Sequence, residues 1–244
     1  MARERLDVRV HAEGLAESRQ QAQALIRAGK ILVNDVVSDK PGTRIQDTAI
    51  VRLRGTPLKY VSRGGHKLAG ALDHFDVDPT GCVCADLGAS TGGFTDCLLQ
   101  RGAARVYAVD VGYGQLAWKL QQDQRVVVMD RTNVRHLTTL PETPDLVVGD
   151  LSFISLSLIL PPLALFAPSA TAVLLIKPQF EAGPGGVKGG KVKNPAIRQA
   201  AIDAVVTAAR AQGAVVHGTV ASALPGAKKG NIEELIHLTL PQSG

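Results

Sequence analysis

The chain has 244 residues, of which 45% are hydrophobic, so it can form a full α/β domain with a small second domain. This composition excludes a disordered or fibrous protein. Residues 1–70 hold 13 Lys and Arg against 7 Asp and Glu, whereas the rest of the chain is almost neutral. Positive charge confined to the N-terminal quarter predicts contact with a polyanion there, with a merely solvated basic surface as the alternative.

The cysteines, the N-terminal residues and the longest uncharged stretch predict the cellular compartment of the protein. Cys82, Cys84 and Cys97 have the spacing of neither a disulfide framework nor a zinc site, so we expect a reducing, cytoplasmic compartment and no metal. Residues 1–11 are charged throughout, which predicts no signal peptide. Residues 151–176 carry no charge and are long enough to span a bilayer, but prolines interrupt them. A buried helix, a loop and a parallel strand explain them better, so no membrane contact is expected.

Residues 1–60 have the pattern of a small α+β domain. A short helix is expected to open at Arg5-Leu6-Asp7. Ser18 and Gln21 form a capping box, which predicts a second helix that stops at Gly29. Short strands are expected at residues 31–33 and 50–53, with a turn at Asn34-Asp35 after the first. Residues 55–60 are the expected joint to the next domain.

From residue 61 to residue 244, strands alternate with helices, which predicts an α/β domain built on a mostly parallel sheet. A helix is expected from the Asn194-Pro195 pair to about Gln212, and an earlier helix is expected to end near Gly102. Residues 183–193, rich in Gly and Lys, are expected to form a mobile loop. The predicted strands are 82–85, 106–109, 126–129, 146–148, 173–176, 214–220 and 232–240.

The strongest local signal is Asp86 followed by a glycine-rich turn and a helix. Backbone can approach a ligand closely at such a turn. The turn lacks the G-x-G-x-x-G spacing that seats a pyrophosphate, and an acid there suits the amino group of an amino-acid cofactor instead. Asp110 and Asp130 end the next two strands, and Asp110 is placed to accept hydrogen bonds from ribose hydroxyls. The three acids predict a nucleoside ligand without phosphate; helix caps and turn residues are the alternative.

Four further residues form a second constellation. Lys67 precedes the sheet, Asp150 and Lys177 end two of its strands, and Glu233 follows Gly230-Asn231-Ile232. A lysine directly after a run of Val, Leu and Ile can be partly desolvated, which favours its neutral form. Such a lysine could accept the proton of a ribose hydroxyl that attacks a methyl sulfonium. Ordinary surface charges are the alternative for each residue taken alone.

These motifs resemble those of the TlyA (haemolysin A) family of ribosomal RNA methyltransferases, which share a catalytic domain with FtsJ-type 2′-O-methyltransferases. The N-terminal module resembles an S4 RNA-binding domain, although Asp35 stands where a glycine would be expected. The resemblance implies a Rossmann-like methyltransferase sheet whose last strand is antiparallel. It also implies methylation of a ribose 2′-hydroxyl, in a cytidine of structured ribosomal RNA. The similarity is carried by residues 61–68, 86–95, 149–155, 176–181 and 230–233.

The resemblance also implies roles for particular residues. Lys67, Asp150, Lys177 and Glu233 take the family's Lys-Asp-Lys-Glu catalytic positions, with Lys177 removing the proton. The expected cofactor is S-adenosylmethionine, bound by Asp86, Gly88, Ser90, Gly92, Gly93, Phe94, Asp110 and Asp130. The expected partner is ribosomal RNA or a ribosomal subunit, contacted by Arg3, Arg5, Arg9, Arg19, Arg27, Lys30, Arg63, Lys188, Lys191 and Lys193.

The low aromatic content favours recognition of folded RNA through its shape and backbone. The three loop lysines are expected either to close over the substrate or to belong to a disordered linker. Three other classes stay open from the sequence. They are a non-catalytic RNA-binding factor on the same fold, a membrane-active haemolysin that would use residues 151–176, and an NAD-dependent oxidoreductase. The missing pyrophosphate motif disfavours the last of these.

Overall fold

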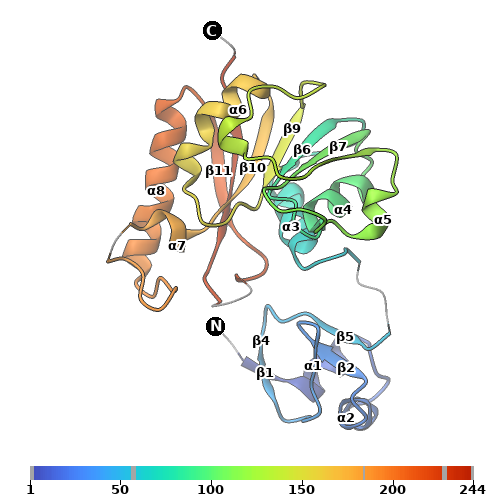
Figure 1. Cartoon of the computed structure of the whole chain (residues 1–244). Coiled ribbons are helices and arrows are strands. Elements are labelled where there is room, and N and C mark those ends of the chain that lie inside the picture. Colours follow the sequence, from blue (N-terminus) through green and yellow to red (C-terminus); the bar gives the residue numbers. More distant parts are fainter. Residues whose placement is uncertain (1–2, 56–58, 184, 227–229, 243–244) are drawn as a thin grey trace. The chain divides into compact units, whose positions relative to one another are not determined.

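The computed structural model describes residues 3–55, 59–183, 185–226 and 230–242 (Figure 1). The chain divides into two compact units, residues 1–59 and 60–244. Residues 56–58, within the expected joint, lie outside the described residues. Each unit has its own buried core and is described by itself.

The N-terminal unit packs two helices against two small antiparallel sheets, ordered β1-β4 and β3-β2-β5. Its elements are β1 (Arg3–Arg5), α1 (Leu6–Ala12), α2 (Arg19–Arg27), β2 (Ile31–Val33), β3 (Val36–Val37), β4 (Arg44–Gln46) and β5 (Val51–Leu53). Both predicted helices and both predicted strands are present. The sequence pattern missed β1, β3 and β4 because strands of two or three residues are too short to show alternation.

The predicted helix cap and the predicted turn are both present in the N-terminal unit. Ser18 caps α2 by accepting a hydrogen bond from the Gln21 backbone N–H. In a complete capping box the Gln21 side chain would accept a hydrogen bond from the Ser18 N–H, but here it accepts one from the N–H of Glu17. Asn34 and Asp35 have φ of 50° and 68°, the left-handed pair that joins β2 to β3. Asp35 therefore adopts the conformation for which glycine was expected.

Asp7 is the polar centre of the N-terminal unit. Its carboxylate is fully buried and accepts hydrogen bonds from Arg5, Arg19 and Gln23. The hydrogen bond from the Arg5 guanidinium is the main reason that the pKa of Asp7 lies well below its usual range, although burial opposes it. The ionised form of this carboxylate is thus stabilised by folding.

Asp7→Asn is expected to destabilise this unit at neutral pH and to flatten its response to acid. A lowered native pKa stabilises the fold above the ordinary carboxyl pKa of about 4, and this contribution is lost as the pH falls toward the native value. Urea unfolding of wild type and variant at pH 7 and below pH 4 measures both effects. A variant as stable as wild type at pH 7 would contradict the assignment.

The C-terminal unit is built on one seven-stranded sheet, ordered β11-β12-β10-β9-β6-β7-β8. The strands β10, β9, β6, β7 and β8 pair in parallel, and β12 is antiparallel to both of its neighbours, β10 and β11, so six of the seven strands run in the same direction. This is the mostly parallel sheet with an antiparallel last strand that was expected. The strands are β6 (Val83–Leu87), β7 (Arg105–Val109), β8 (Val126–Met129), β9 (Leu146–Gly149), β10 (Thr171–Ile176), β11 (Val215–Ala221) and β12 (Glu234–Thr239).

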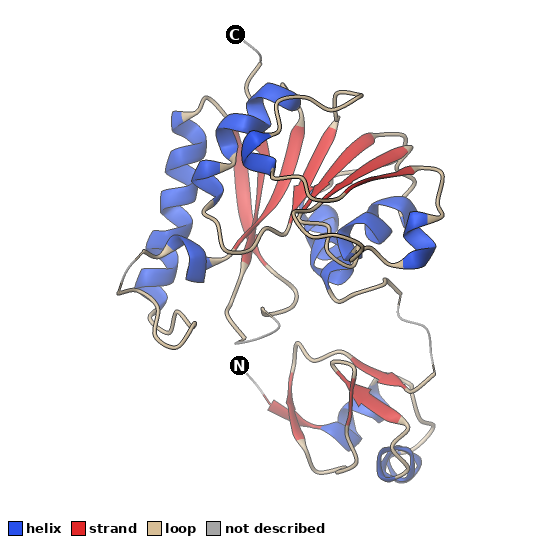
Figure 2. Ribbon diagram, viewed as in Figure 1, coloured by secondary structure: helices blue, strands red, loops and turns tan. Residues whose placement is uncertain are grey.

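Helices cover both faces of this sheet (Figure 2). They are α3 (Gly64–Phe75), α4 (Gly93–Gln100), α5 (Trp118–Gln121), η1 (Val134–His136), η2 (Leu156–Leu158), α6 (Leu160–Phe166), α7 (Pro178–Glu181) and α8 (Pro195–Ala211). Leu68 and Leu98 bury α3 and α4 in one apolar layer. Leu163 and Ile202 bury α6 and α8 in the other. The parallel strands are therefore apolar on both sides, as their continuous Val, Leu and Ile runs predict.

Two differences from the sequence prediction affect the site. Residues 64–75 form α3, which was not predicted because two glycines open it and glycine disfavours helix. The first strand runs on to Leu87, so Asp86 lies within β6 instead of at its end.

Residues 151–176 form η2, α6 and β10. In the described part of the chain, no helix is long and apolar enough to cross a membrane.

Candidate active site

The glycine turn after β6 brings two loops together at the carboxyl edge of the sheet. Gly88 has φ of +78°, and a Cβ on it would lie 3.0 Å from the backbone oxygen of Asp150. Any side chain at this position would therefore be strained and would push against the loop that follows β9. The glycine lets the β6 and β9 exits lie in contact, and a cavity opens beside them.

The first cavity has a volume of about 590 Å³ and lies over the ends of β6, β7 and β9. Asp110 is held at its wall by two backbone donors, since its carboxylate accepts from the N–H groups of Ser90 (2.8 Å) and Gly112 (2.7 Å). Three of the expected cofactor residues line this cavity, namely Gly88, Ser90 and Asp110. Lining residues that were not predicted include Gln115, Thr132, Asn133 and Arg135.

Asp86 does not line the cavity but lies fully buried behind it. One carboxylate oxygen accepts hydrogen bonds from the backbone N–H and hydroxyl of Thr95, which fixes the start of α4. The other oxygen, Oδ1, has no hydrogen-bond partner among the described residues. Burial raises the pKa of Asp86 to about 7, although the bonds from Thr95 act in the opposite direction.

The remaining expected cofactor residues are also outside the cavity lining. Gly93 lets α3 and α4 approach, because a Cβ there would lie 2.9 Å from the backbone nitrogen of Gly65. Gly92 starts α4 with φ of +93°, and Phe94 is buried in the core. Asp130 accepts a hydrogen bond from the backbone N–H of Gly114. These four residues shape the turn and its neighbours without facing the cavity.

The four expected catalytic residues all line a second cavity, of about 480 Å³. Lys177 Nζ lies 2.5 Å from Asp150 Oδ1 and donates a hydrogen bond to Ser152 Oγ at 2.7 Å. Lys67 Nζ lies 2.5 Å from Glu233 Oε2, and both of these side chains are buried. The site thus holds two lysine–carboxylate pairs, a convergence that sequence spacing alone could not show.

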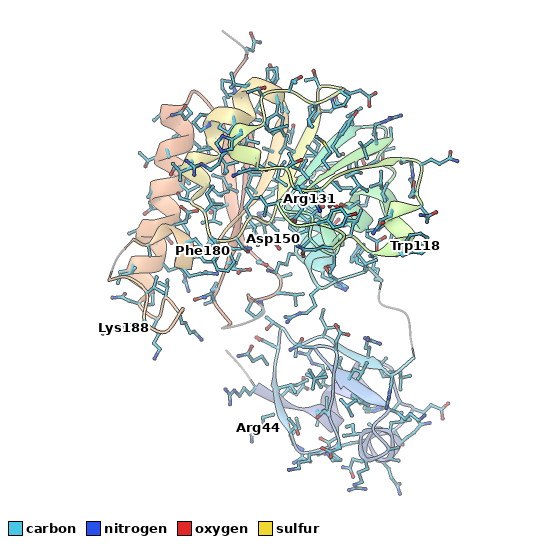
Figure 3. All side chains as sticks on the ribbon, viewed as in Figure 1. Arg44, Trp118, Arg131, Asp150, Phe180 and Lys188 are labelled. Carbon is cyan, nitrogen blue, oxygen red and sulfur yellow. The ribbon has the colours of Figure 1, made fainter. Side chains whose placement is uncertain are left out.

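The two cavities share a wall. Asp150, Ser152 and Phe153 line both of them. Phe153 is 83% exposed, and its ring centroid lies 5.1 Å from that of Phe180, which lines the second cavity. Figure 3 labels Asp150 near the middle of the C-terminal unit and Phe180 toward the position of α7 in Figure 1. Ser152, Phe153 and Phe180 were not expected to have a role, although they lie within the motif segments 149–155 and 176–181.

The lysine-rich loop borders the second cavity through Val187 and Gly190. Its residues Lys188 and Lys191 pair through their backbones, and the side chains of Lys188, Lys191 and Lys193 are exposed. Figure 3 labels Lys188. Buried Asn231 donates a hydrogen bond to the Gly190 carbonyl and accepts one from the Val192 N–H. The described part of this loop is therefore fastened to the segment before β12, which carries Asn231 and Glu233.

The basic residues of the N-terminal unit that were expected to contact RNA differ in their ion pairs. Arg3, Arg27 and Lys30 are exposed. Arg5 and Arg19 are also exposed but form ion pairs with Asp7, and half-buried Arg9 forms ion pairs with Glu4 and Glu13. In the other unit, Arg63 is half-buried at the start of α3. The paired arginines support the fold of their unit as well as its charge.

Comparison with known proteins gives the class of each unit. Residues 60–239 match the family model of the FtsJ-like methyltransferases, and residues 4–51 match that of the S4 domain. The chain is therefore an FtsJ-like methyltransferase joined to an S4 domain.

Its relatives define the family more closely. The chain is 49% identical to the 16S/23S rRNA (cytidine-2′-O)-methyltransferase TlyA of Mycobacterium tuberculosis, over 97% of this chain and 90% of the relative. It is 41% identical to hemolysin A of Brachyspira hyodysenteriae, over 97% of this chain and all of the relative. A solved structure of a candidate hemolysin from Streptococcus thermophilus matches with a TM-score of 0.76 and 42% identity, over 100% and 90% of the two chains. The chain belongs to the TlyA (hemolysin A) family.

Proposed function

We propose that this protein transfers the methyl group of S-adenosylmethionine to the 2′-hydroxyl of a cytidine ribose in structured ribosomal RNA. The observation that carries the proposal is Lys177, whose ammonium lies against Asp150 and Ser152 on the wall shared by the two cavities. The mycobacterial relative is named for this reaction on 16S and 23S rRNA, and it is similar to this chain over nearly its whole length.

The first cavity fits the proposed cofactor. Its volume lies within the range of roughly 300–1,000 Å³ that is usual for small-molecule sites. Asp110 offers a carboxylate at the wall for ribose hydroxyls, and Gly88 and Ser90 offer backbone and a hydroxyl. The buried Oδ1 of Asp86 is an unpaired acceptor next to this turn, which suits an amino group. The bound cofactor would supply an electrophilic methyl group on a sulfonium.

The second cavity supplies the proton chemistry. Lys177 in its neutral form would accept the proton of the ribose hydroxyl, and its contacts with Asp150 and Ser152 fix the position of its nitrogen. Lys67 and Glu233 neutralise each other inside the same cavity and hold α3 close to the residue that precedes β12. The exposed ring of Phe153 beside Phe180 offers an apolar face on which a nucleobase can stack.

The S4 domain and the basic surface are the proposed means of holding RNA. Arg3, Arg27 and Lys30 would contact phosphates from the N-terminal unit, and the exposed loop lysines would do so beside the second cavity. Such contacts position the substrate without reading its sequence.

The proposed function is tested by methyl transfer itself. Purified protein, tritiated S-adenosylmethionine and undermethylated ribosomal subunits should yield labelled RNA, and 2′-O-methyl mapping should place the label on a cytidine. No label on subunits or free rRNA would refute the proposal and favour an RNA-binding factor without catalysis.

Asp110→Ala is expected to weaken S-adenosylmethionine binding strongly. Hydrogen bonds to a charged group contribute about 1.5–3 kcal/mol, so the Kd should rise roughly 10- to 100-fold. Isothermal titration measures the change. Asp130→Ala is the matched control, because Asp130 does not line the cavity and its loss should leave the Kd nearly unaltered. Equal effects of the two substitutions would remove Asp110 from the proposed cofactor site.

Replacing both Arg27 and Lys30 with glutamate is expected to weaken RNA binding without altering the affinity for S-adenosylmethionine. Each lost phosphate contact should lower the slope of log K against log salt by about 1. Filter binding of rRNA at several salt concentrations measures the slope. An unchanged slope would mean that this end of α2 does not face RNA.

A further inference from the structure

Two loop segments meet at the wall between the cavities. One is residues 150–156, which leave β9, and the other is residues 177–181, which leave β10 and form α7. Lys177 joins them at one end through its contacts with Asp150 and Ser152. Both partners come from the first segment, so this contact depends on how that segment is held.

The same segments are joined a second time by Glu181. Its carboxylate accepts a hydrogen bond from the Ser155 hydroxyl at 2.6 Å and another from the Leu156 backbone N–H at 2.9 Å. Bonds to an ionised acceptor are stronger than bonds between neutral groups. The contact is not needed to cap η2, because Ser155 Oγ already accepts from the Ser157 N–H there.

A strained residue lies between the two connections. Phe153 has φ of +65°, the left-handed region, although it is not glycine. This conformation costs about 1–2 kcal/mol and persists only where the surroundings fix it. The ring of Phe153 packs against Phe180, one residue before Glu181. The 150–156 segment is thus kept in an unfavourable conformation by contacts on both sides.

We propose that Glu181 is a positioning residue that clamps the 150–156 segment onto α7. By doing so it keeps Asp150 and Ser152 against the Lys177 ammonium and keeps Phe153 at the entrance of both cavities. The proposal rests on the proposed methyltransferase function for its effect on turnover, but the clamp itself is a statement about the conformation of residues 150–156.

The test compares Glu181→Ala with Glu181→Gln and with Asp203→Asn. Asp203 is an exposed acid on α8, so the third variant controls for loss of one negative charge in the same unit. Small displacements of a reacting group can cost as much as about 100-fold, so Glu181→Ala should lower kcat at least tenfold with a smaller change in KM for RNA. Glu181→Gln should restore most of kcat, because the amide can accept from the Leu156 N–H and donate to Ser155 Oγ.

A second readout does not depend on catalysis. Chymotrypsin cleavage after Phe153 should be faster in Glu181→Ala than in wild type, because a released segment opens locally more often. Ser155→Ala removes one of the two bonds and should show the same effect more weakly, which serves if Glu181→Ala does not fold. Wild-type kcat in Glu181→Ala, no rescue by Gln, or unchanged cleavage would each overturn the clamp. If cleavage changes as expected while no form of the protein transfers methyl, the proposed function fails and the clamp stands.

Discussion

Lys177→Ala should reduce kcat for methyl transfer by about 10²- to 10⁴-fold, the usual contribution of a positioned general base, while S-adenosylmethionine binding survives. Lys177 Nζ lies 2.5 Å from Asp150 Oδ1 and 2.7 Å from Ser152 Oγ, at the wall between the two cavities. The alanine removes the proposed proton acceptor and leaves the glycine turn and Asp110 in place. Single-turnover methylation of ribosomal subunits measures the rate, and titration measures cofactor affinity.

Lys177→Arg separates proton transfer from charge. A guanidinium keeps the positive charge and can still donate hydrogen bonds to Asp150 and Ser152, but it cannot give up its proton near neutral pH. It should therefore be nearly as inactive as the alanine variant. Arg210→Ala, which removes an exposed charge from α8, is the control and should retain wild-type rates. Substantial activity in Lys177→Arg would show that this residue acts through its charge and not as a base.

Lys67→Met should destabilise the C-terminal unit by about 3–5 kcal/mol, the usual effect of removing one partner of a buried ion pair. Glu233 is only 3% exposed, and its carboxylate would lose the Lys67 ammonium that lies 2.5 Å away. Methyl transfer should fall as well, since both residues line the second cavity. Urea unfolding monitored by circular dichroism gives the stability change.

The double variant Lys67→Met/Glu233→Leu distinguishes folding from catalysis. With both charges gone, much of the lost stability should return, because two apolar side chains can replace a buried pair at little cost. Methyl transfer should stay low. If the double variant were as unstable as the sum of the two single variants, the two side chains would not be coupled as the structure has them.

The sheet could be predicted because its strands are continuous apolar runs, and the expected strands at residues 106–109 and 126–129 lie within β7 and β8. The directions of the side chains at the strand ends were harder to predict than the strands themselves. Successive side chains of a strand point to opposite faces, so extending β6 to Leu87 places Asp86 in the core instead of at the sheet edge. Asp110 follows the last residue of β7 and does line the cavity. A difference of two residues in one strand end therefore separates a buried acid from an accessible one.

The pairing of the four proposed catalytic residues could be predicted only in part. Asp150 and Lys177 end neighbouring strands, so pairing of β9 with β10 was enough to bring them together. Lys67 and Glu233 are 166 residues apart and meet only because α3, which was not predicted, packs against β10 close to the segment that leads into β12. Their pairing depends on tertiary packing that no local pattern encodes. Ser155 and Glu181 are joined in the same way, through a contact between the 150–156 segment and α7 that the sequence does not show.

The partition formed by Asp150, Ser152 and Phe153 has a thermodynamic consequence. Any movement of this backbone changes the shape of both chambers at once, since the same three residues line each of them. Linkage then requires reciprocity. If a nucleotide in one cavity changes the affinity of the other cavity for its ligand by some factor, that ligand changes the affinity for the nucleotide by the same factor. An enzyme built this way can hold its donor weakly until the acceptor arrives.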